Sequence, residues 1–505
     1  MATSLRPGQT TADRLRAAAA AHPDREAYVH GEKRVTYVWL DRAADGFAAT
    51  LLDAGVAPGD VVCLLLPSSI KFAACYLGAL RAGAVTSAIN LRLGPAEQAS
   101  IIGRTEPRVT VVGDGAAVPA GVDAGHQLSV TELGHAFGAD PSHQLPDVSP
   151  TDPACIVWTS GTTGAPKGAV YDHATMAVIS RNIGELTRPG DRRLVALPFP
   201  HVGYMTRMWD ELANGTTLVL VGEPWAAEET LRLVRDERIT MATGVPTQWS
   251  LVLAHPDVDR TDFANLRVAA IGGAAIAPDL VRQMRKVLAC PVITRYTSTE
   301  AGVTTSTLVD DDDDTIATTV GRPAPEVELR IAAPDGAVLP DGEVGEVCCR
   351  SAAMFKGYWR DPETTRAAVD GDGWLHTGDL GYVGADGNLR IVGRLKEMYI
   401  RGGYNVYPAE VEAVLADHPS VARAAVVGVP DPVLGEIGAA FVVPVAGPSP
   451  PDLDTLRGWC RDRLADYKAP DRLTVLDELP LTSMLKVDKR ALAAQATPPH
   501  RREDR

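Results

Sequence analysis

Short apolar runs alternate with helix-like segments along most of the chain, and this alternation limits the folds open to it. The run VVCLLLP at 61–67 has the length of a buried strand and ends at a proline. Residues 69–82 have the pattern of a helix closed by Gly83, and AVTSAIN at 84–90 is strand-like again. Similar runs follow at 109–113, 195–199, 217–221, 239–243, 267–271 and 291–295. The alternation predicts an α/β fold of layered, largely parallel sheets.

The composition and the predicted secondary structure change at two points in the sequence, and these points suggest domain boundaries. From about residue 320, short strands rich in Gly, Pro and Asp predict a small β subdomain. After Arg394 a helix is expected to start at Pro408, and the last hundred or so residues alternate strand and helix, as in a small mobile α+β domain. We therefore expect an N-terminal domain at 1–395, a C-terminal domain at 396–495 and a disordered tail at 496–505. At the other end, residues 11–30 are expected to be helical.

Composition and charge exclude several classes of partner. The chain has 505 residues, of which 45% are apolar and 22% charged, as in ordinary globular proteins of two or more domains. A formal net charge of −15 argues against nucleic acid or an anionic membrane as the main partner. The acidic run Asp310 to Asp314 is expected to form an exposed loop, with a metal site there as the second choice.

The cysteines and the apolar segments indicate a compartment. Seven cysteines are present, an odd number, and their spacings match no zinc pattern, so they predict buried reduced thiols. The N-terminal segment lacks the apolar core of a signal peptide, and no stretch approaches ~20 uninterrupted apolar residues. We expect a cytoplasmic protein without a membrane span.

A loop rich in Gly, Ser and Thr is the most informative segment for function. In CIVWTSGTTGAPKGAVYDH (155–173) a strand breaks into a loop that supplies hydroxyls, flexible backbone and a lysine: Thr159, Ser160, Gly161, Thr162, Thr163, Gly164 and Lys167. Backbone N–H groups, hydroxyls and an ammonium together suit a polyphosphate. The spacing is not that of a Walker A loop. A flexible linker is the alternative, but a linker would not follow a buried strand directly.

The segment TSGTTGAPKG resembles the phosphate loop of the adenylate-forming superfamily of AMP-binding enzymes, which includes acyl-CoA synthetases, luciferases and the adenylation domains of peptide synthetases. Further matches follow in the family's order, so the resemblance covers nearly the whole chain. It implies a large N-terminal domain and a small C-terminal domain that rotates between two half-reactions.

Three matching segments imply a nucleotide site. IGGAAI (271–276) is similar to the segment that packs against adenine, which assigns Gly272, Gly273 and Ala274. RYTSTEAG (295–302) resembles the YGxTE motif, with Thr297 where Gly is common. That match implies Tyr296 on adenine, Thr299 on the α-phosphate and Glu300 on Mg²⁺. GWLHTGDLG (373–381) implies that Asp379 holds the ribose, and Arg394 would contact the ribose too.

The C-terminal matches imply a hinge and a catalytic lysine. In GRLKEMYIRGGYNVYPAEVE (393–412), Lys396 falls at the hinge position, and Gly402 and Gly403 would border the pantetheine tunnel. LPLTSMLKVDKRAL (479–492) resembles the terminal motif and assigns the catalytic lysine to Lys486, with Lys489 as the fallback. Leu485 stands where the family usually has Gly, so the loop path or the delivery of the lysine is expected to differ.

The acid pocket is predicted from LPFPHVGYMT (197–206) and its neighbours. Its candidate residues are mostly apolar or aromatic, which favours a hydrophobic acid: His201, Tyr204, Met205, Trp249, Ala274 and Val303. For His201 a structural role is an equal alternative. Val202 falls where peptide synthetases place an Asp for the amino group, which disfavours amino acids. Arg207 is expected at the surface, with a second polar group of the acid as its alternative partner.

The resemblance implies an acid–thiol ligase that uses ATP and Mg²⁺ to form an acyl-adenylate and then transfers the acyl group to coenzyme A. Lys486, Thr299 and Glu300 are the expected catalytic residues. The acid is predicted to be a fatty or aryl acid. A carrier protein or a non-thiol group as acceptor remains an alternative, as does a non-catalytic homologue. A homodimer is compatible with the sequence.

Overall fold

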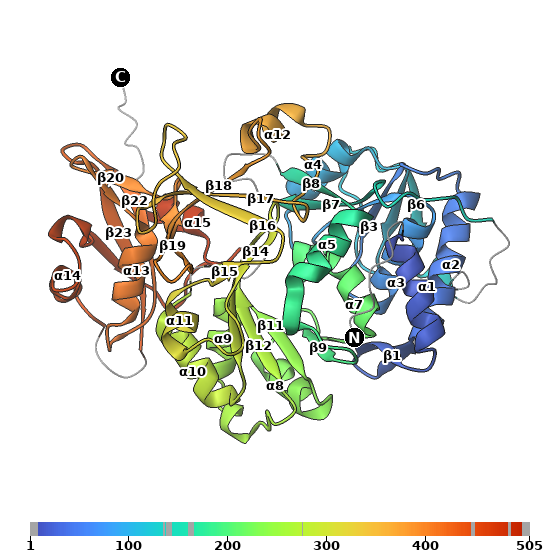
Figure 1. The fold of residues 1–505 in the computed structure, drawn as a ribbon, viewed down its shortest axis with the longest axis horizontal. Helices are drawn as coiled ribbons and strands as arrows, with labels where there is room; N and C mark the ends of the chain where they lie inside the picture. Colours follow the sequence, from blue (N-terminus) through green and yellow to red (C-terminus); the bar gives the residue numbers. More distant parts are fainter. Residues whose placement is uncertain are drawn as a thin grey trace.

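The computed structural model describes residues 9–134, 137, 144–159, 166–274, 276–445, 450–482 and 486–496. Figure 1 shows the N-terminal helices at one end of the molecule and the C-terminal elements at the opposite end. Four sheets organise the described part of the chain. The α/β fold class predicted from the alternating pattern is confirmed.

The first sheet carries the strand that leads into the phosphate loop. Its strand order is β6 (His126–Ser129), β5 (Val109–Val112), β3 (Val61–Leu65), β4 (Val85–Ala88), β7 (Pro153–Thr159) and β8 (Lys167–Asp172). The pairs are parallel except β7 with β8, which is antiparallel. The fully buried runs of β3 and β4 are what a sheet covered on both faces requires.

The second sheet places the adenine-side segments at its strand ends. Its order is β15 (Arg322–Pro323), β14 (Gly302–Ser306), β13 (Val292–Ser298), β12 (Val268–Gly272), β11 (Met241–Gly244), β9 (Arg192–Val195), β10 (Thr217–Leu220), β1 (Glu26–His30) and β2 (Lys33–Thr36). The strands from β13 to β1 are parallel, and antiparallel strands complete both edges. The carboxyl ends of parallel strands meet at one edge, where α/β proteins bind ligands.

Helices cover these two sheets and supply most of the core. They are α1 (Thr11–Ala21), α2 (Tyr37–Asp53), α3 (Ile70–Arg81), α4 (Pro95–Thr105), α5 (His173–Ile183), α6 (Val202–Met205), α7 (Met208–Asn214), α8 (Ala227–Asp236), α9 (Pro246–Leu253) and α10 (Pro278–Leu288). The largest apolar cluster joins α1, α2, α3 and α5 to the first sheet. None of the described helices is long and apolar enough to cross a bilayer.

A third, antiparallel sheet forms the β subdomain expected from about residue 320. It consists of β16 (Val327–Ala332), β17 (Gly345–Ser351), β18 (Leu375–Val383) and β19 (Leu389–Arg394), with α12 (Pro362–Ala368) beside it. In β18 the register with β17 shifts between Glu346 and Cys348, which leaves extra residues around Gly378. Such a bulge redirects the side chains that follow it.

The fourth sheet contains only strands that begin at Tyr399 or later. Its order is β21 (Tyr404–Val406), β20 (Tyr399–Arg401), β23 (Gly435–Pro444) and β22 (Val421–Asp431), with β24 (Arg472–Val475) on β23. Helices α13 (Pro408–Ala416), α14 (Leu453–Arg461) and α15 (Lys489–Ala496) pack on it. Two apolar clusters are made entirely of residues from this part of the chain. A separate domain needs a hydrophobic core of its own.

Two local expectations were wrong. The helix expected over residues 11–30 ends at Ala21, because Pro23 disfavours a helical conformation at His22, and residues 26–30 form β1 instead. The acidic run is only partly a loop, since Asp312 caps the short helix α11 (Asp313–Thr318) by accepting a hydrogen bond from the Thr315 amide. All seven cysteines are buried and unpaired, as expected.

Candidate active site

Two motifs that lie far apart in the sequence meet at Asp379. This residue lies within the bulge of β18, and its register partner on β19 is Arg394, whose Nε lies 3.0 Å from Asp379 Oδ1. The Tyr296 hydroxyl, at the end of β13, donates a hydrogen bond of 2.5 Å to Asp379 Oδ2. The Asp379 carboxylate is buried, whereas the Arg394 side chain is half exposed. The structure therefore brings together three of the residues predicted to hold the nucleoside.

The C-terminal elements bring Lys486 to this cluster. Burial and the neighbouring Arg394 lower the pKa of the Lys486 ammonium to about 8, while Asp379 acts in the opposite direction. The Lys486 main chain is fixed by its carbonyl, which accepts a 2.7 Å hydrogen bond from the Thr482 amide. Residues 483–485, and with them Leu485, lie outside the described residues. The Lys486 ammonium therefore lies within electrostatic range of two residues predicted to hold the nucleoside, Asp379 and Arg394.

The fallback lysine occupies a different environment. Lys489 Nζ lies 2.8 Å from a carboxylate oxygen of Glu397 and 2.8 Å from one of Glu412. Burial alone would lower its pKa, but the two carboxylates raise it above the usual value. Lys489 thus ties α15 to the segment after β19 and to α13. This contact favours Lys486 over Lys489 for the catalytic assignment.

The segment before α7 carries the predicted acid-side residues. His201 Nδ1 accepts a hydrogen bond of 3.1 Å from the Gly203 amide and caps α6. Burial and the nearby Lys486 ammonium lower the pKa of His201 to about 3, so the imidazole is neutral at physiological pH. The Lys486 ammonium therefore lies within electrostatic range of this segment. A cap and a position beside the lysine are compatible with both roles expected for His201.

Two other pocket candidates make contacts within the core. The Tyr204 ring stacks on Phe199 with a centroid distance of 3.5 Å, and its hydroxyl lies 2.9 Å from that of Tyr28. Met205 is fully buried, and its carbonyl accepts a 2.6 Å hydrogen bond from Tyr76. Both residues therefore fix the position of the segment, and a contact with the acid stays a prediction for them.

Arg207 is not at the surface as expected. Its side chain is buried, and one guanidinium nitrogen lies 2.8 Å from Asp210 Oδ2 and 2.8 Å from the Thr187 hydroxyl. Asp210 is only three positions from Arg207, but the burial of the pair and the contact with Thr187, 20 positions away, could not be seen in the sequence. A buried arginine without such partners would be strongly unfavourable.

The remaining candidates lie on or next to the second sheet: Trp249 on α9, Val303 in β14, and Gly272, Gly273 and Ala274 at the end of β12. Trp249 donates a 3.1 Å hydrogen bond to the Ala270 carbonyl, and Val303 is buried in β14. Gly272 ends β12, and a Cβ there would lie 2.6 Å from the Arg295 carbonyl oxygen, so a side chain cannot be accommodated. Gly273 has a φ of +82°. Ala274 is exposed.

Glu300 and Lys167 are linked through a residue that the sequence analysis missed. The Tyr358 hydroxyl donates a 2.8 Å hydrogen bond to Glu300 Oε1, and Lys167 Nζ lies 5.2 Å from the centre of the Tyr358 ring. Tyr171 donates to the Thr299 carbonyl. Burial and the Glu300 carboxylate raise the pKa of Tyr358, so the phenol remains a donor. The aromatic pair in KGYW (356–359) was the available signal.

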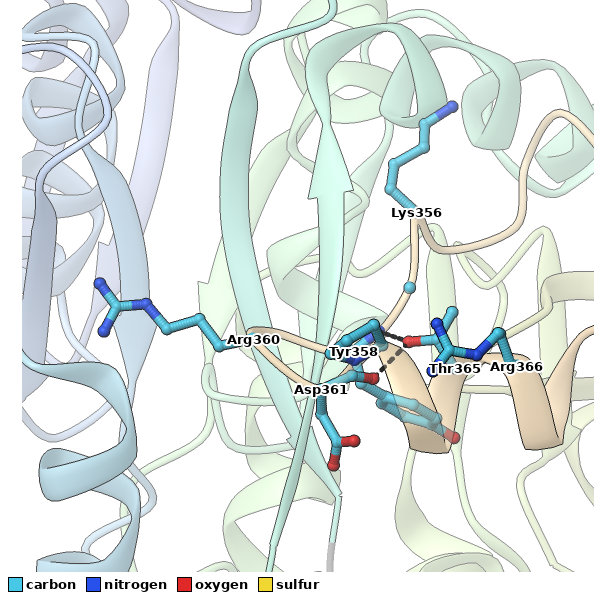
Figure 2. Close-up of a pocket in the computed structure, with 8 residues that line it drawn as sticks. Lys356, Tyr358, Arg360, Asp361, Thr365 and Arg366 are labelled. Carbon is cyan, nitrogen blue, oxygen red and sulfur yellow. Dashed lines mark hydrogen bonds between the residues drawn. The ribbon is translucent and has the colours of Figure 1, made fainter.

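A shallow pocket lies directly beside this tyrosine. Figure 2 shows Tyr358 with Lys356, Arg360 and Arg366 around the start of α12, where the Tyr358 amide donates a 2.9 Å hydrogen bond to the Thr365 hydroxyl. Thr159 ends β7 and its hydroxyl donates a 3.4 Å hydrogen bond to the Lys167 carbonyl. The predicted loop residues Ser160, Gly161, Thr162, Thr163 and Gly164 lie outside the described residues.

The predicted hinge and tunnel residues lie on the C-terminal side. Lys396 is exposed in the turn between β19 and β20. Gly402 and Gly403 form the two-residue turn between β20 and β21, with φ values of +58° and +89°. Two successive positive φ values are typical of a tight hairpin turn and explain the glycine pair.

The donor set fits the groups predicted to bind. A buried carboxylate beside an aromatic ring suits a nucleoside, and an ammonium within the same cluster suits a phosphate. Glu300, next to the threonine predicted to meet the α-phosphate, offers carboxylate oxygen to Mg²⁺, a hard cation that prefers oxygen ligands. The site combines cations, carboxylates and hydrogen-bond donors and needs no protein nucleophile.

Comparison with known proteins agrees with the fold and identifies the family. A family model described as AMP-binding enzyme matches residues 15–359, and one described as AMP-binding enzyme C-terminal domain matches residues 410–486. The chain therefore belongs to the AMP-binding enzymes. Within them it is an enzyme of the AMP-forming acid–CoA ligase family.

Three relatives illustrate the range of this family. A 3-[(3aS,4S,7aS)-7a-methyl-1,5-dioxo-octahydro-1H-inden-4-yl]propanoyl:CoA ligase from Rhodococcus jostii is 35% identical, over 96% of this chain and 98% of that protein. A feruloyl-CoA synthase from an Amycolatopsis species is 36% identical, over 92% and 95%. The solved structure of the amide bond synthetase McbA from Marinactinospora thermotolerans has a TM-score of 0.87 at 30% identity, over 97% and 100%.

Proposed function

We propose that this enzyme activates a hydrophobic fatty or aryl acid with ATP and Mg²⁺ and transfers the acyl group to coenzyme A. The observation that carries the proposal is the cluster of Tyr296, Asp379 and Arg394, which is joined by contacts of 2.5 Å and 3.0 Å and whose charges act on the Lys486 ammonium.

In the first half-reaction the acid carboxylate attacks the α-phosphorus of ATP and pyrophosphate leaves. The two reacting groups are both anionic, so their approach depends on positive charge arranged in advance. Lys486 supplies an ammonium, and Asp379 with Arg394 orients the ribose. Mg²⁺ held by Glu300 would supply Lewis-acid charge to the phosphate oxygens. Thr299 donates to the α-phosphate, and Tyr296 packs on adenine.

The second half-reaction requires a different arrangement. The coenzyme A thiol attacks the acyl carbonyl and AMP leaves, so the pantetheine arm must reach the carbonyl that Lys486 faces in the first step. We propose that the domain at 396–495 rotates about Lys396 and brings the turn at Gly402 and Gly403 to the tunnel. A few residues at the end of an element commonly absorb such a rotation.

The class of acid is proposed from the side chains around the predicted pocket. His201 is neutral, and Trp249 and Val303 are apolar or aromatic, a lining that favours a hydrophobic acid. The Rhodococcus relative is named for a bicyclic propanoate and the Amycolatopsis relative for ferulate, which supports a ring-bearing acid.

A second acceptor class has one specific observation in its favour. The similar solved structure McbA is an amide bond synthetase, so an amine acceptor occurs within this fold at comparable identity. A carrier-protein thiol is the further alternative, since the adenylation motifs are shared between these classes.

The test is a pyrophosphate-release screen over fatty, aryl and amino acids, followed by mass analysis of the product formed from the best acid. We expect release with ring-bearing or fatty acids and an acyl-CoA product when coenzyme A is added. An amide formed with added amines, or acylation of a holo carrier protein in preference to coenzyme A, would replace the acceptor assignment. No release with any acid would overturn the proposal.

A further inference from the structure

A cluster of three metal-ligating side chains lies on β17 and β18, next to the turn that holds Asp379. Glu346 and Cys348 are two positions apart on β17 and therefore point to the same face of the sheet. His376 on β18 is the direct cross-strand partner of Cys348. One atom from each of these residues lies within 4.8 Å of the others.

The separations approach those of a tetrahedral zinc site. His376 Nδ1 lies 3.5 Å from Cys348 Sγ and 2.8 Å from Glu346 Oε2. Around a Zn²⁺ ion with normal bond lengths the corresponding separations are about 3.6 Å and about 3.3 Å. The carboxylate needs to move by only about half an ångström to accommodate the ion.

The second nitrogen of the histidine also has a partner. His376 Nε2 lies 3.6 Å from Asp370 Oδ2, so a carboxylate is available to hold the ring when Nδ1 faces a metal. Arg330 donates to the same Asp370 oxygen at 2.9 Å and lies over the Trp374 ring.

We propose that Glu346, Cys348 and His376 bind one thiophilic divalent cation of the Zn²⁺ class, at a site distinct from the Mg²⁺ site. Sequence spacing could not show it, because the ligands come from two strands and His376 lies 28 positions after Cys348 and 30 positions after Glu346. The site has three protein ligands, which leaves a fourth tetrahedral position for water.

Glu346 connects this site to the nucleotide. While Oε2 faces His376, the other oxygen, Oε1, accepts a 3.0 Å hydrogen bond from the Gly378 amide, in the bulge directly before Asp379. Gly378 has a φ of +71°, so this bond holds a turn that most residues could not adopt. A cation that draws Glu346 toward it therefore shifts or stiffens the turn that positions Asp379. This coupling rests on the proposed nucleotide role of Asp379, whereas metal binding itself does not.

Metal binding is tested on chelator-treated protein with Co²⁺ alone, which reports a thiolate ligand by a charge-transfer band in the near ultraviolet. We expect one Co²⁺ per chain, displaced by Zn²⁺, with the band lost in Cys348→Ser and the affinity reduced at least tenfold in His376→Gln. Cys349→Ser is the matched control, because Cys349 is the adjacent cysteine and points to the opposite face. The proposal is overturned if no thiolate band forms, or if Cys349→Ser removes it.

The coupling is measured separately, as the change in AMP affinity on addition of one equivalent of Zn²⁺. A change of threefold or more in the native protein that disappears in His376→Gln supports the coupling. The partly exposed His376 is the safer position for this test, since its replacement creates no cavity in the core. An equal response in both proteins overturns the coupling while leaving metal binding to be judged by the Co²⁺ band.

Discussion

The Tyr296 hydroxyl and the Asp379 carboxylate are 83 positions apart and share a hydrogen bond of 2.5 Å. This bond joins the end of a parallel-sheet strand to the bulge of the β subdomain. Burial and Asp379 raise the pKa of Tyr296 well above its ordinary value, so the phenol keeps its proton across any assay range. The orientation of Asp379 thus depends on Tyr296 on one side and Arg394 on the other.

The first prediction removes this bond and keeps the ring. Tyr296→Phe should raise the KM for ATP about tenfold, because a hydrogen bond to a charged group contributes about 1.5–3 kcal/mol, while kcat stays within about threefold. The measurement is pyrophosphate release against ATP concentration. Tyr382→Phe, on the same strand as Asp379 but outside the site, is the control and should leave KM unchanged. An unchanged KM in Tyr296→Phe would contradict the prediction, because it would mean that ATP binding does not depend on the hydrogen bond that orients Asp379.

The second prediction separates the two lysines of the C-terminal segment. Lys486→Ala should slow acyl-adenylate formation by about 10²–10³, as the loss of one preorganised charge contact does. The same variant should still convert supplied acyl-adenylate and coenzyme A into thioester, because that step does not use the ammonium. Lys489→Ala breaks the ion pairs with Glu397 and Glu412 and should reduce thermal stability more than adenylation. Normal pyrophosphate release from Lys486→Ala would refute the assignment.

The third prediction concerns pH. Burial, with Arg394 nearby, lowers the pKa of Lys486 to about 8. A lysine acts as a cation only below its pKa, so kcat/KM for adenylation should be flat below that value. Above it, kcat/KM should fall about tenfold per pH unit, because this ratio reports the free enzyme. In Lys486→Arg, kcat/KM should stay constant up to about pH 10, because a guanidinium stays charged over this range. A native profile that is flat to pH 10 would contradict the prediction.

His201 gives this profile an internal check. Burial and Lys486 lower its pKa to about 3, so its ionisation should produce no inflection between pH 5 and 8. An inflection near 6.5, lost in His201→Asn, would mean that the imidazole is less buried than the structure indicates.

The residues of the site that could be predicted from the sequence are those that lie in or beside a recognisable local pattern. Tyr296 and Gly272 stand at the ends of apolar runs, and such runs indicate strands whose carboxyl ends meet at one edge. Asp379 and Arg394 are close in sequence and pair on adjacent strands. These features are local, so pattern and motif were sufficient to find them.

Other features depend on contacts that no local pattern encodes. The buried partners of Arg207, the link from Tyr358 to Glu300 and the cluster around Cys348 all arise from tertiary packing. The choice between Lys486 and Lys489 likewise required their surroundings, because both are lysines within four positions of each other. The residue types are visible in the sequence, but only the fold shows which charges are already paired.

The last prediction addresses the proposed rotation at Lys396. Lys396→Pro restricts φ to about −65° and should prevent the turn after β19 from changing conformation. Pyrophosphate release should then stay within about threefold of the native rate, because Lys486 already lies within electrostatic range of Asp379 and Arg394, while thioester formation from isolated acyl-adenylate should fall at least 30-fold. Lys396→Ala is the control: it removes the same side chain but leaves the backbone free, so it should retain both steps. Single-turnover measurements of each half-reaction distinguish the cases, and equal thioester rates in the proline and alanine variants would place the pivot elsewhere.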